Sequence, residues 1–384
     1  MVMANNNENK VLNVPHLRFP EFSGEWVTKS INDLAVVIGG GTPDTTVKSY
    51  WDGEIQWFTP SEIGKNKYVD SSLRTITEVG LNNSSAKLLP PNTILLSSRA
   101  TIGECSLSLR ECATNQGFQC LVSKKCNVDF LYYLIQTKKK DLIRKSCGST
   151  FLEISANEVR KIQVSVPSDV EQQKIAELLS LIDERIATQN KIIEDLKKLK
   201  SAISLKMLHS DSWEQFKIQD IASIGRGRVI SSVEISQQEN PLYPVYSSQT
   251  SNDGIMGYLD DFMFEGEYIS WTTDGANAGT VFYRNGKFNC TNVCGLLKLK
   301  KGFDAHFVSL VLAEATRMYV STNLANPKLM NNTMGNIQIR LPKLEEQKRI
   351  SVVFRKLHGL LETHNSLIIK YSKQKQYLLS QMFI

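Results

Sequence analysis

Two stretches of the chain, residues 167–209 and 342–384, repeat apolar residues at alternating steps of four and three. In the first stretch the positions with this spacing are Ile175, Leu179, Ile182, Ile186, Ile193, Leu196 and Ile203. In the second stretch they are Ile350, Phe354, Leu357, Leu361, Ile368, Tyr371 and Leu378. This spacing is typical of a coiled-coil seam, and each stretch has glutamate early in its sequence, as a helix start favours. The pattern predicts two long helices, each about 57 Å if roughly 38 residues rise by ~1.5 Å.

Both seams are interrupted by polar residues at the same two places, Gln189 matching His364 and Lys200 matching Lys375. Paired polar interruptions fix register and partner, so we predict that the helices pack on each other as an antiparallel coiled coil with pseudo-twofold symmetry. Three further apolar residues widen the first stripe: Leu178, Ile192 and Leu199. A helix on another subunit is therefore an alternative partner, and we expect both kinds of contact.

The helices are part of an internal repeat. Pro167 and the run 171–175 return as Pro342 and the run 346–350, 175 positions later. The N-terminal portions of the two globular parts match less closely: Trp26 corresponds to Trp213, and Ala35 corresponds to Ala222. In the interiors, Thr114-Asn115 matches Thr291-Asn292, and Asp129 matches Asp304 at the start of a helix-like stretch. Divergent interiors on a repeated scaffold are what two modules that read different targets would need, and the alternative is neutral drift in loops. We favour the first interpretation, because loops on a fixed scaffold usually carry recognition.

Each globular part has short β-rich runs, such as 93–97 and 268–271, separated by Gly, Pro, Asn and Ser. Helical patterns lie mainly in 128–145 and 303–320. The fold class is therefore α+β, with two β-rich mixed domains each followed by a long helix. We expect five segments: a flexible tail 1–14, domain 15–166, helix 167–209, domain 210–341 and helix 342–384.

Polar, glycine-rich loops at matching depths are the candidates for nucleic-acid contact. Such loops allow close approach to phosphates, while Arg, Asn, Gln, Ser and Thr supply donors and acceptors for base edges. Ordinary turns use the same residue types. In the first domain the candidates are Gly40, Thr42, Ser97, Ser98, Arg99, Thr101, Lys138, Lys139, Arg144 and Lys145. In the second domain they are Arg226, Arg228, Ser248, Gln249, Trp271, Thr272, Thr273 and Asn277.

The basic run 138–145 has two open interpretations. Its lysines and arginine could contact phosphates, or they could form a solvated helix end that complements the helix dipole. The net charge of +6 does not decide between them, because it is unevenly distributed. Residues 15–166 hold 18 basic and 15 acidic residues, a charge of +3, whereas residues 211–341 hold 11 basic and 13 acidic residues, a charge of −2.

Composition is that of a globular protein, with 41% hydrophobic and 22% charged residues. There is no apolar run of the ~18 residues that a membrane span needs, and the first ten residues carry no apolar signal segment. We therefore expect a cytoplasmic protein with no membrane contact. The 7 cysteines form no framework of tight pairs, which favours buried, reduced thiols over disulfides or zinc.

Motifs for chemistry are missing. The sequence has no P-loop and no Asn/Asp-Pro-Pro-aromatic pocket of the kind that adenine methyltransferases carry. A metal-dependent nuclease could be built on Asp44 and Glu54, but Gln56 stands where such a site has lysine. We expect no catalytic residue, no metal site and no cofactor bound by this chain.

Three motifs and their order carry a family resemblance. They are Pro15-x-Leu17-Arg18-Phe19-Pro20-x-Phe22-x-Gly24-x-Trp26, the Glu-Gln-Gln-Lys-Ile run at 171–175 and the Glu-Glu-Gln-Lys-Arg-Ile run at 345–350. With the order domain, helix, domain, helix, the chain resembles the specificity subunits of type I restriction-modification enzymes. The resemblance covers essentially the whole chain after the first dozen residues.

The resemblance implies that the two domains are target recognition domains, each reading one half of a split site in double-stranded DNA, with the helices setting the gap. It implies two adenine methyltransferase subunits and restriction (translocase) subunits as partners, which would hold S-adenosylmethionine, ATP and magnesium. Recognition domains diverge strongly in this family, so base-contacting residues cannot be transferred. One alternative stays open, a coiled-coil assembly scaffold whose globular ends bind proteins, because the second domain is net acidic.

Overall fold

A computed structural model describes residues 12–148, 152–321 and 326–384. The chain divides into two compact units. Unit 1 comprises Met1–Ile192 and His364–Ile384, and unit 2 comprises Ile193–Thr363. Most of the expected tail, residues 1–11, lies outside the described residues. At its end, the Asn13 side chain donates a 2.6 Å hydrogen bond to the carbonyl of Trp26, so unit 1 begins before residue 15.

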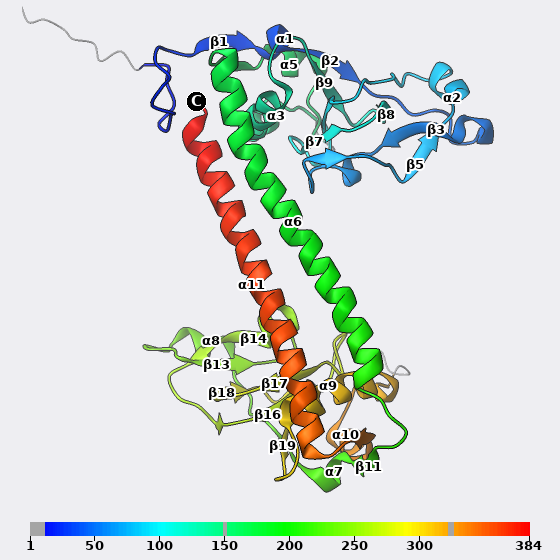
Figure 1. The fold of residues 1–384 in the computed structure, drawn as a ribbon, viewed down its shortest axis with the longest axis vertical. Coiled ribbons are helices and arrows are strands. Elements are labelled where there is room, and N and C mark those ends of the chain that lie inside the picture. Colours follow the sequence, from blue (N-terminus) through cyan, green and yellow to red (C-terminus); the bar gives the residue numbers. More distant parts are fainter. Residues whose placement is uncertain (1–11, 149–151, 322–325) are drawn as a thin grey trace, which may run out of the picture. The chain divides into compact units, whose positions relative to one another are not determined.

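Unit 1 contains two sheets and a two-stranded ribbon (Figure 1). Its strands are β1 (Val27–Ser30), β2 (Ala35–Gly39), β3 (Trp51–Phe58), β4 (Tyr68–Val69), β5 (Arg74–Ile76), β6 (Ile94–Leu96), β7 (Cys105–Ser108), β8 (Cys112–Thr114), β9 (Gln119–Ser123) and β10 (Gln163–Val166). Its short helices are α1 (Ile31–Leu34), α2 (Glu78–Asn82), α3 (Val128–Thr137), α4 (Lys139–Arg144) and α5 (Ala156–Lys161). The strand orders are β2-β9-β6-β7-β4, β5-β3-β8 and β1-β10.

Unit 2 has nearly the same plan. Its strands are β11 (Glu214–Lys217), β12 (Ala222–Arg226), β13 (Tyr243–Tyr246), β14 (Ile255–Leu259), β15 (Phe264–Glu265), β16 (Tyr268–Thr272), β17 (Val281–Arg284), β18 (Lys287–Cys290), β19 (Cys294–Leu299) and β20 (Gln338–Leu341). Its short helices are α7 (Ile218–Ile221), α8 (Ser232–Ser236), α9 (Ala305–Ala315) and α10 (Asn331–Asn336). The strand orders are β12-β19-β16-β17, β14-β13-β18-β15 and β11-β20.

The core of each unit forms where one helix covers a sheet. In unit 1, Phe130 and Leu134 of α3 pack with Leu96 and Leu121 of the larger sheet, and all four are fully buried. In unit 2, Phe307 and Val308 of α9 take part in the corresponding core. The α+β fold is therefore confirmed, and the repeat continues through the interiors whose sequences diverge.

The structure corrects two of the matched positions. Asn127 and Asp304 are the caps of α3 and α9, and their backbone N–H groups donate to Gln172 and Gln347 at 3.0 and 2.9 Å. Asn127, rather than Asp129, is therefore the counterpart of Asp304. In the parallel strand pairs, Phe58 of β3 pairs with Thr114 and Tyr246 of β13 pairs with Cys290. The structural counterpart of Thr114 is therefore Cys290, one residue before Thr291, which the sequence match had suggested.

The predicted helical stretches are also shorter and more numerous than expected. The stretch 128–145 is split between α3 and α4, and 303–320 is split between α9 and a 3-10 turn at Thr316–Tyr319. The sequence did not indicate α5 or α10, which precede β10 and β20. Six residues are too few to show helical periodicity.

The two long helices are α6 (Asp169–Met207) and α11 (Leu344–Met382). Within unit 1 they run antiparallel, because Asp183 contacts Lys375 at 2.8 Å and Gln189 contacts His364 at 2.5 Å. His364 lies 175 residues after Gln189, and 175 is the offset of the repeat. The two residues are therefore counterparts in the repeat, and they form this hydrogen bond with each other. Lys375 is tolerated in the seam because the Asp183 carboxylate neutralises it. The prediction that the helices pack on each other is confirmed.

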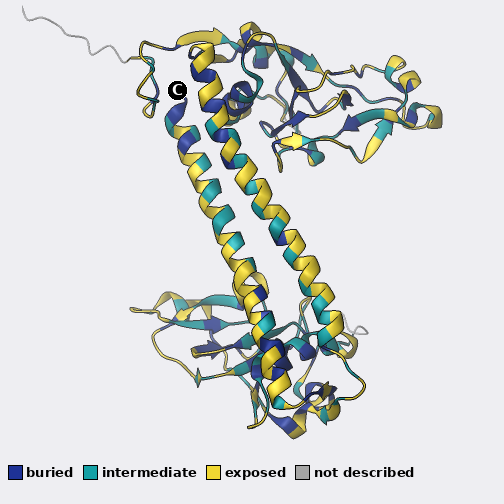
Figure 2. Ribbon diagram, in the orientation of Figure 1, coloured by how far each residue is buried: buried dark blue, intermediate teal, exposed yellow. Residues whose placement is uncertain are grey.

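The seam positions differ in what covers them (Figure 2). Ile175, Leu179, Ile182 and Leu378 belong to the unit 1 core, whereas Ile350 and Phe354 belong to the unit 2 core. Ile193 and Leu357 are also buried. The remaining seam positions are half-buried: Ile186, Leu196, Ile203, Leu361, Ile368 and Tyr371. Of these, Ile186 and Tyr371 pack against the unit 1 core and Ile203 packs against the unit 2 core. The heptad stripe therefore contributes to the globular cores near both ends of each long helix, as well as to the helix pair.

All 7 cysteines are free thiols, and Cys147 alone is exposed, which corrects the expectation that every thiol is buried. Among the described residues, no helix is both long and apolar enough to cross a membrane.

Candidate nucleic-acid interface

In each unit, loops that follow strands of the two sheets meet at one side, which we call the loop edge. The loop edge of unit 1 consists of residues 39–43, 97–103 and 114–118. The N–H of Gly41 donates to the carbonyl of Thr114 at 2.8 Å, and the N–H of Ser98 donates to the carbonyl of Gly117 at 2.8 Å. The Thr42 hydroxyl donates to the Gln116 side chain at 2.5 Å. The structure thus brings together candidate residues that lie far apart in the sequence.

Glycine is required at this junction for close approach. A Cβ on Gly40 would lie 2.1 Å from the carbonyl oxygen of Asn115, a distance that no side chain tolerates. Gly40 therefore allows two loops to pack backbone against backbone.

The loop edge of unit 2 consists of residues 225–228, 247–250, 273–279 and 290–293. The N–H of Arg228 donates to the carbonyl of Cys290 at 3.2 Å, and the N–H of Thr273 donates to that of Val293 at 3.1 Å. A Cβ on Gly227 would lie 1.6 Å from the Cys290 carbonyl, so Gly227 repeats the role of Gly40. The candidates Ser248 and Gln249 are half-buried in the loop that joins this edge.

Five of the candidate side chains are buried inside the units. They are Ser97, Ser98, Trp271, Thr272 and Thr273. The Trp271 ring nitrogen donates to the carbonyl of Leu329 at 2.9 Å, and the Ser97 hydroxyl donates to that of Arg99 at 2.8 Å. Ser97 and Trp271 hold their loops in place through these bonds, whereas the buried Ser98 hydroxyl has no hydrogen-bond partner within the described residues. In this structure the five side chains are covered, which argues against direct contact with a base edge.

Other candidates present polar groups at the surface of the loop edges. Thr101 and Asn277 are exposed. The Arg99 side chain is 42% exposed beside Glu153 at 2.8 Å, and that of Arg228 is 43% exposed beside Glu234. Arg226 donates to the side chain of Asn331 at 2.9 Å. These side chains are placed where a duplex could reach them, and contact with DNA stays a prediction.

In the basic run of unit 1, three of the five basic side chains pair with carboxylates and a fourth donates to the backbone. Lys138 donates to the carbonyl of Ile384 at 2.6 Å, and Lys139 pairs with Glu104. Arg144 pairs with Asp141 at 2.7 Å, and Lys145 lies 3.9 Å from Glu158. These contacts favour the interpretation as a helix end, although they leave phosphate contact untested.

Two polar residues were missed by the sequence reasoning: Gln116, which lies in the loop edge of unit 1, and Asn331, which accepts a hydrogen bond from Arg226 of the unit 2 loop edge. Gln116 is exposed and directly follows the repeated Thr114-Asn115 pair, which was a usable signal. Asn331 is the first residue of α10, whose existence the sequence did not indicate.

Backbone strain also occurs in these loops. Ala100 has a φ of 53° in the loop 97–103, and Asn252 and Asp253 have φ of 49° and 53° just after the loop 247–250. A left-handed conformation costs a non-glycine residue about 1 kcal/mol or more, and such strain clusters at functional sites. In unit 2, Arg284 holds the strained turn by pairing with Asp253 at 2.7 Å.

The arrangement of Asp44 and Gln56 does not support the nuclease alternative. Hydrogen bonds from the side chain and backbone of Thr46, at 2.7 and 2.8 Å, lower the pKa of Asp44 and occupy its carboxylate. The Gln56 side chain accepts from the N–H of Ser72 at 2.7 Å. Within the described parts of the chain, no group of three His, Cys, Asp or Glu residues could hold a metal ion.

A family model described as the type I restriction modification DNA specificity domain matches this chain twice, at residues 23–198 and 210–370. The chain belongs to this family. The two matches follow the repeat, because each contains one globular part and most of the helix after it.

Relatives in the specificity family align with parts of the chain. The MjaIX specificity subunit of Methanocaldococcus jannaschii is 39% identical over 180 residues, which is 46% of this chain and 42% of that subunit. The putative specificity subunit S.MpnORF365P of Mycoplasma pneumoniae is 35% identical over 246 residues, 60% of this chain and 89% of the relative.

A solved structure shares the fold. The S subunit of a type I restriction-modification system from M. genitalium superposes with a TM-score of 0.69 at 17% identity, covering 97% of this chain and 99% of that subunit. Membership of the specificity family favours DNA recognition over a scaffold whose globular ends bind proteins.

Proposed function

We propose that this chain is the DNA specificity subunit of a type I restriction-modification complex and that each unit reads one part of a split duplex site. The observation that carries this proposal is that one loop edge is built twice with unlike side chains, on sheets whose strand order matches except for the edge strands β4 and β15. Loops on a rigid scaffold are the usual place for recognition, and unlike loops would read unlike sequences.

The exposed groups of the two edges fit base and phosphate contacts. Arg99 in unit 1 and Arg228 in unit 2 could approach guanine or phosphate, and their present carboxylate partners would then exchange for DNA. Gln116 and Asn277 can each donate and accept, as recognition of adenine requires. The globular part of unit 2, residues 211–341, is net acidic, so its binding would depend more on base edges than on phosphates.

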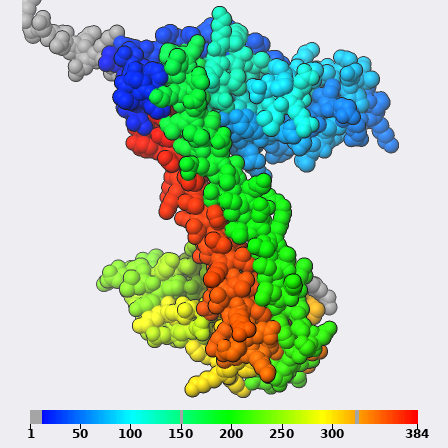
Figure 3. Space-filling view, viewed as in Figure 1, coloured from blue at the N-terminus to red at the C-terminus, as the bar shows by residue number. Residues whose placement is uncertain are grey.

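The proposal includes partner subunits. Two adenine methyltransferase subunits and restriction (translocase) subunits would bind S-adenosylmethionine, ATP and magnesium, while this chain would carry no catalytic residue. The long helices are suited to docking, because apolar side chains stay exposed along them: Leu181, Leu199 and Leu205 on α6, and Val352, Leu360, Ile369 and Tyr377 on α11. One face of α6 is uncovered in the space-filling view (Figure 3).

A selection experiment tests DNA recognition. The chain assembled with its methyltransferase would be incubated with a library of random duplexes, and the bound fraction would be sequenced at two salt concentrations. We expect enrichment of a two-part motif with a fixed gap and weaker binding at higher salt, because phosphate contacts release counterions. Bound duplexes with no shared motif would refute the proposal.

A loop-edge variant sharpens the selection. Arg228→Gln removes an exposed donor of unit 2 and should change or relax letters in one half of the motif only. Arg110→Gln is the control, because Arg110 is an exposed residue that pairs with Asp70 at 2.6 Å, outside both loop edges.

A further inference from the structure

In unit 1 a short N-terminal segment, Pro15–Gly24, lies against the start of α6 and the end of α11 (Figure 1). Arg18 donates twice to the Glu171 carboxylate, with both distances 2.8 Å. The N–H of Leu17 donates to the carbonyl of Gln381 at 2.9 Å. The segment is thus held by a carboxylate on one helix and a carbonyl on the other.

Side chains of the segment complete the contact. Phe19 packs against the unit 1 core, and the amine of Lys174 lies 5.0 Å from its ring. Lys174 also pairs with Glu21, three residues after Arg18. Beneath the segment, Trp26 is only 3% exposed. The recognised pattern is an arginine, an aromatic residue after it and an acidic residue at the third position.

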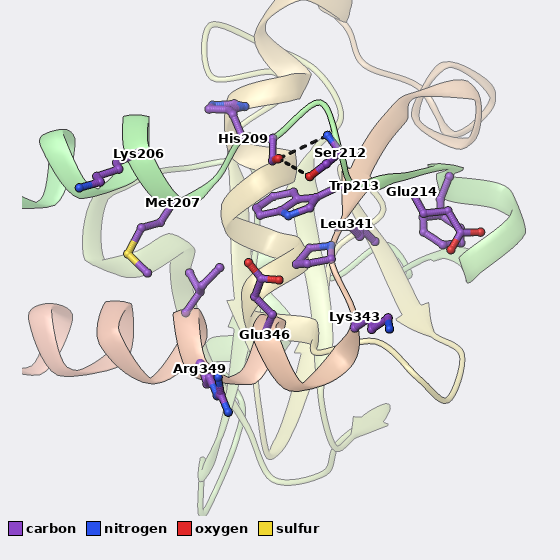
Figure 4. A pocket seen from close by; sticks show the side chains of 14 residues that line it. Lys206, Met207, His209, Ser212, Trp213, Glu214, Leu341, Lys343, Glu346 and Arg349 are labelled. Carbon is purple, nitrogen blue, oxygen red and sulfur yellow. Dashed lines mark hydrogen bonds between the residues drawn. The ribbon is translucent and has the colours of Figure 1, made fainter.

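Unit 2 has a groove at the corresponding place, lined by the end of α6 and the start of α11 (Figure 4). It has a volume of about 800 Å³. By the repeat offset, Glu346 corresponds to Glu171, Arg349 to Lys174 and Lys206 to Gln381, and all three line the groove. Trp213, the counterpart of Trp26, is half-buried rather than buried. The chain around Trp213 comes directly from α6, so no counterpart of Pro15–Gly24 exists in the sequence between them.

The groups that would hold a segment are unsatisfied. Glu346 is exposed and points toward Trp213 (Figure 4), and within residues 12–148, 152–321 and 326–384 its carboxylate has no hydrogen bond or ion pair. Lys206 lies in the last turn of α6, where carbonyls have no partner within the helix. The groove therefore offers one acceptor for a guanidinium, one for a backbone N–H and a cation, Arg349, for a carboxylate.

We propose that the unit 2 groove binds an extended segment of a partner protein with an arginine, an aromatic residue next to it and an acidic residue three positions after the arginine. Charge complementarity defines this chemistry, because Glu346 matches the arginine and Arg349 matches the acid. A second copy of this chain is a poor source, because its own segment is held in its own unit by the Arg18–Glu171 pair. The inference does not depend on the proposed DNA recognition.

Fluorescence anisotropy tests this site on the full chain. The probe is a labelled peptide with the sequence of residues 15–24, which carries the arginine, phenylalanine and glutamate in the required order. We expect saturable binding that weakens at least 10-fold, about 1.4 kcal/mol, in Glu346→Gln. The control is Glu345→Gln, since Glu345 is the neighbouring carboxylate, does not line the groove and pairs with Lys348. Circular dichroism would confirm that both variants are folded.

Three outcomes would overturn the proposal. They are no binding by the unmodified chain at about 1 mM peptide, equal binding by Glu346→Gln, and equal binding of a peptide in which the arginine is glutamine. Equal binding by Glu346→Gln would mean that the peptide displaces the native segment of unit 1 or binds elsewhere. Light scattering checks the second-copy alternative, because a dimer that disappears in Glu346→Gln would contradict a partner protein as the occupant.

Discussion

Replacing Arg18 by alanine should destabilise unit 1 selectively. The Arg18 guanidinium donates from Nε and from a terminal nitrogen to the two oxygens of Glu171, and their side chains are 16% and 2% exposed. Alanine would leave the Glu171 carboxylate inside the protein with one remaining donor among the described residues, the Trp26 ring N–H at 3.3 Å. The free energy of unfolding should therefore fall.

The size of the loss follows from the burial of the pair. Breaking a fully buried ion pair costs about 3–5 kcal/mol, because one charge is left without a partner. Arg18 keeps some solvent contact, so water can reach part of the abandoned site, and we expect about 2 kcal/mol. Replacing both residues by apolar ones, Arg18→Met with Glu171→Leu, should recover most of this loss, because no charge then remains buried.

A matched control separates burial from geometry. Arg110 binds Asp70 with the same two-bond geometry, at 2.6 and 2.9 Å, but their side chains are 66% and 47% exposed. Arg110→Ala should cost less than about 0.5 kcal/mol, because exposed pairs gain little over solvent.

Urea unfolding would measure the total loss, and hydrogen exchange of the β1–β10 ribbon would assign it to unit 1. Equal free energies for Arg18→Ala and Arg110→Ala would refute the reasoning. So would faster exchange spread evenly over both units.

Three further predictions concern pH, packing and length. Burial and the charge of Arg355 lower the pKa of His306 to about 4, so between pH 6.5 and 4 the unfolded state binds more protons than the folded state. The free energy of unfolding should therefore fall as the pH is lowered from 6.5 towards 4. Unfolding measured over this pH range should show a smaller fall in His306→Gln. Gly227→Ala should disrupt the unit 2 loop edge and abolish motif enrichment in DNA selection, because the new Cβ would lie 1.6 Å from the Cys290 carbonyl. The control is Gly359→Ala on α11, outside the loop edges, where an added Cβ has nothing within 4 Å and enrichment should be unchanged. Seven residues inserted in both α6 and α11 at the unit boundary preserve the heptad and add about 10 Å. Sequencing of selected duplexes should then show a gap changed by about three base pairs, with unchanged half-site letters. Altered letters with an unchanged gap would contradict the spacer role.

The parts of the fold that repeat locally could be predicted from the sequence. Heptad spacing depends on residues three or four apart, so both long helices and their seam follow from the pattern around Ile175 and Ile350. The polar interruptions predicted a helix pair, and Gln189 indeed meets His364. The fold class followed from the short β-rich runs and the helical patterns of the globular parts.

The parts that depend on distant contacts could not be predicted. The partner of Lys375 is Asp183, which is 192 residues away, and the partner of Arg18 is Glu171, which is 153 residues away. Loop polarity misled the prediction for Ser97 and Thr272, because buried turns use the same hydroxyls as exposed ones. The open groove of unit 2 could not be predicted either, because the corresponding contacts in unit 1 join residues that are far apart in the sequence, such as Arg18 and Glu171.

Sequencing of methylated bases tests the central claim most directly. A host would carry this chain with its methyltransferase, and a second host would carry a chain whose residues 225–293 come from another member of the specificity family. The account predicts a methylated two-part motif in the first host, and in the second a motif with one half replaced and the other half unchanged. Methylation without a two-part motif, or replacement of both halves, would contradict the claim that each unit reads its own part of the site.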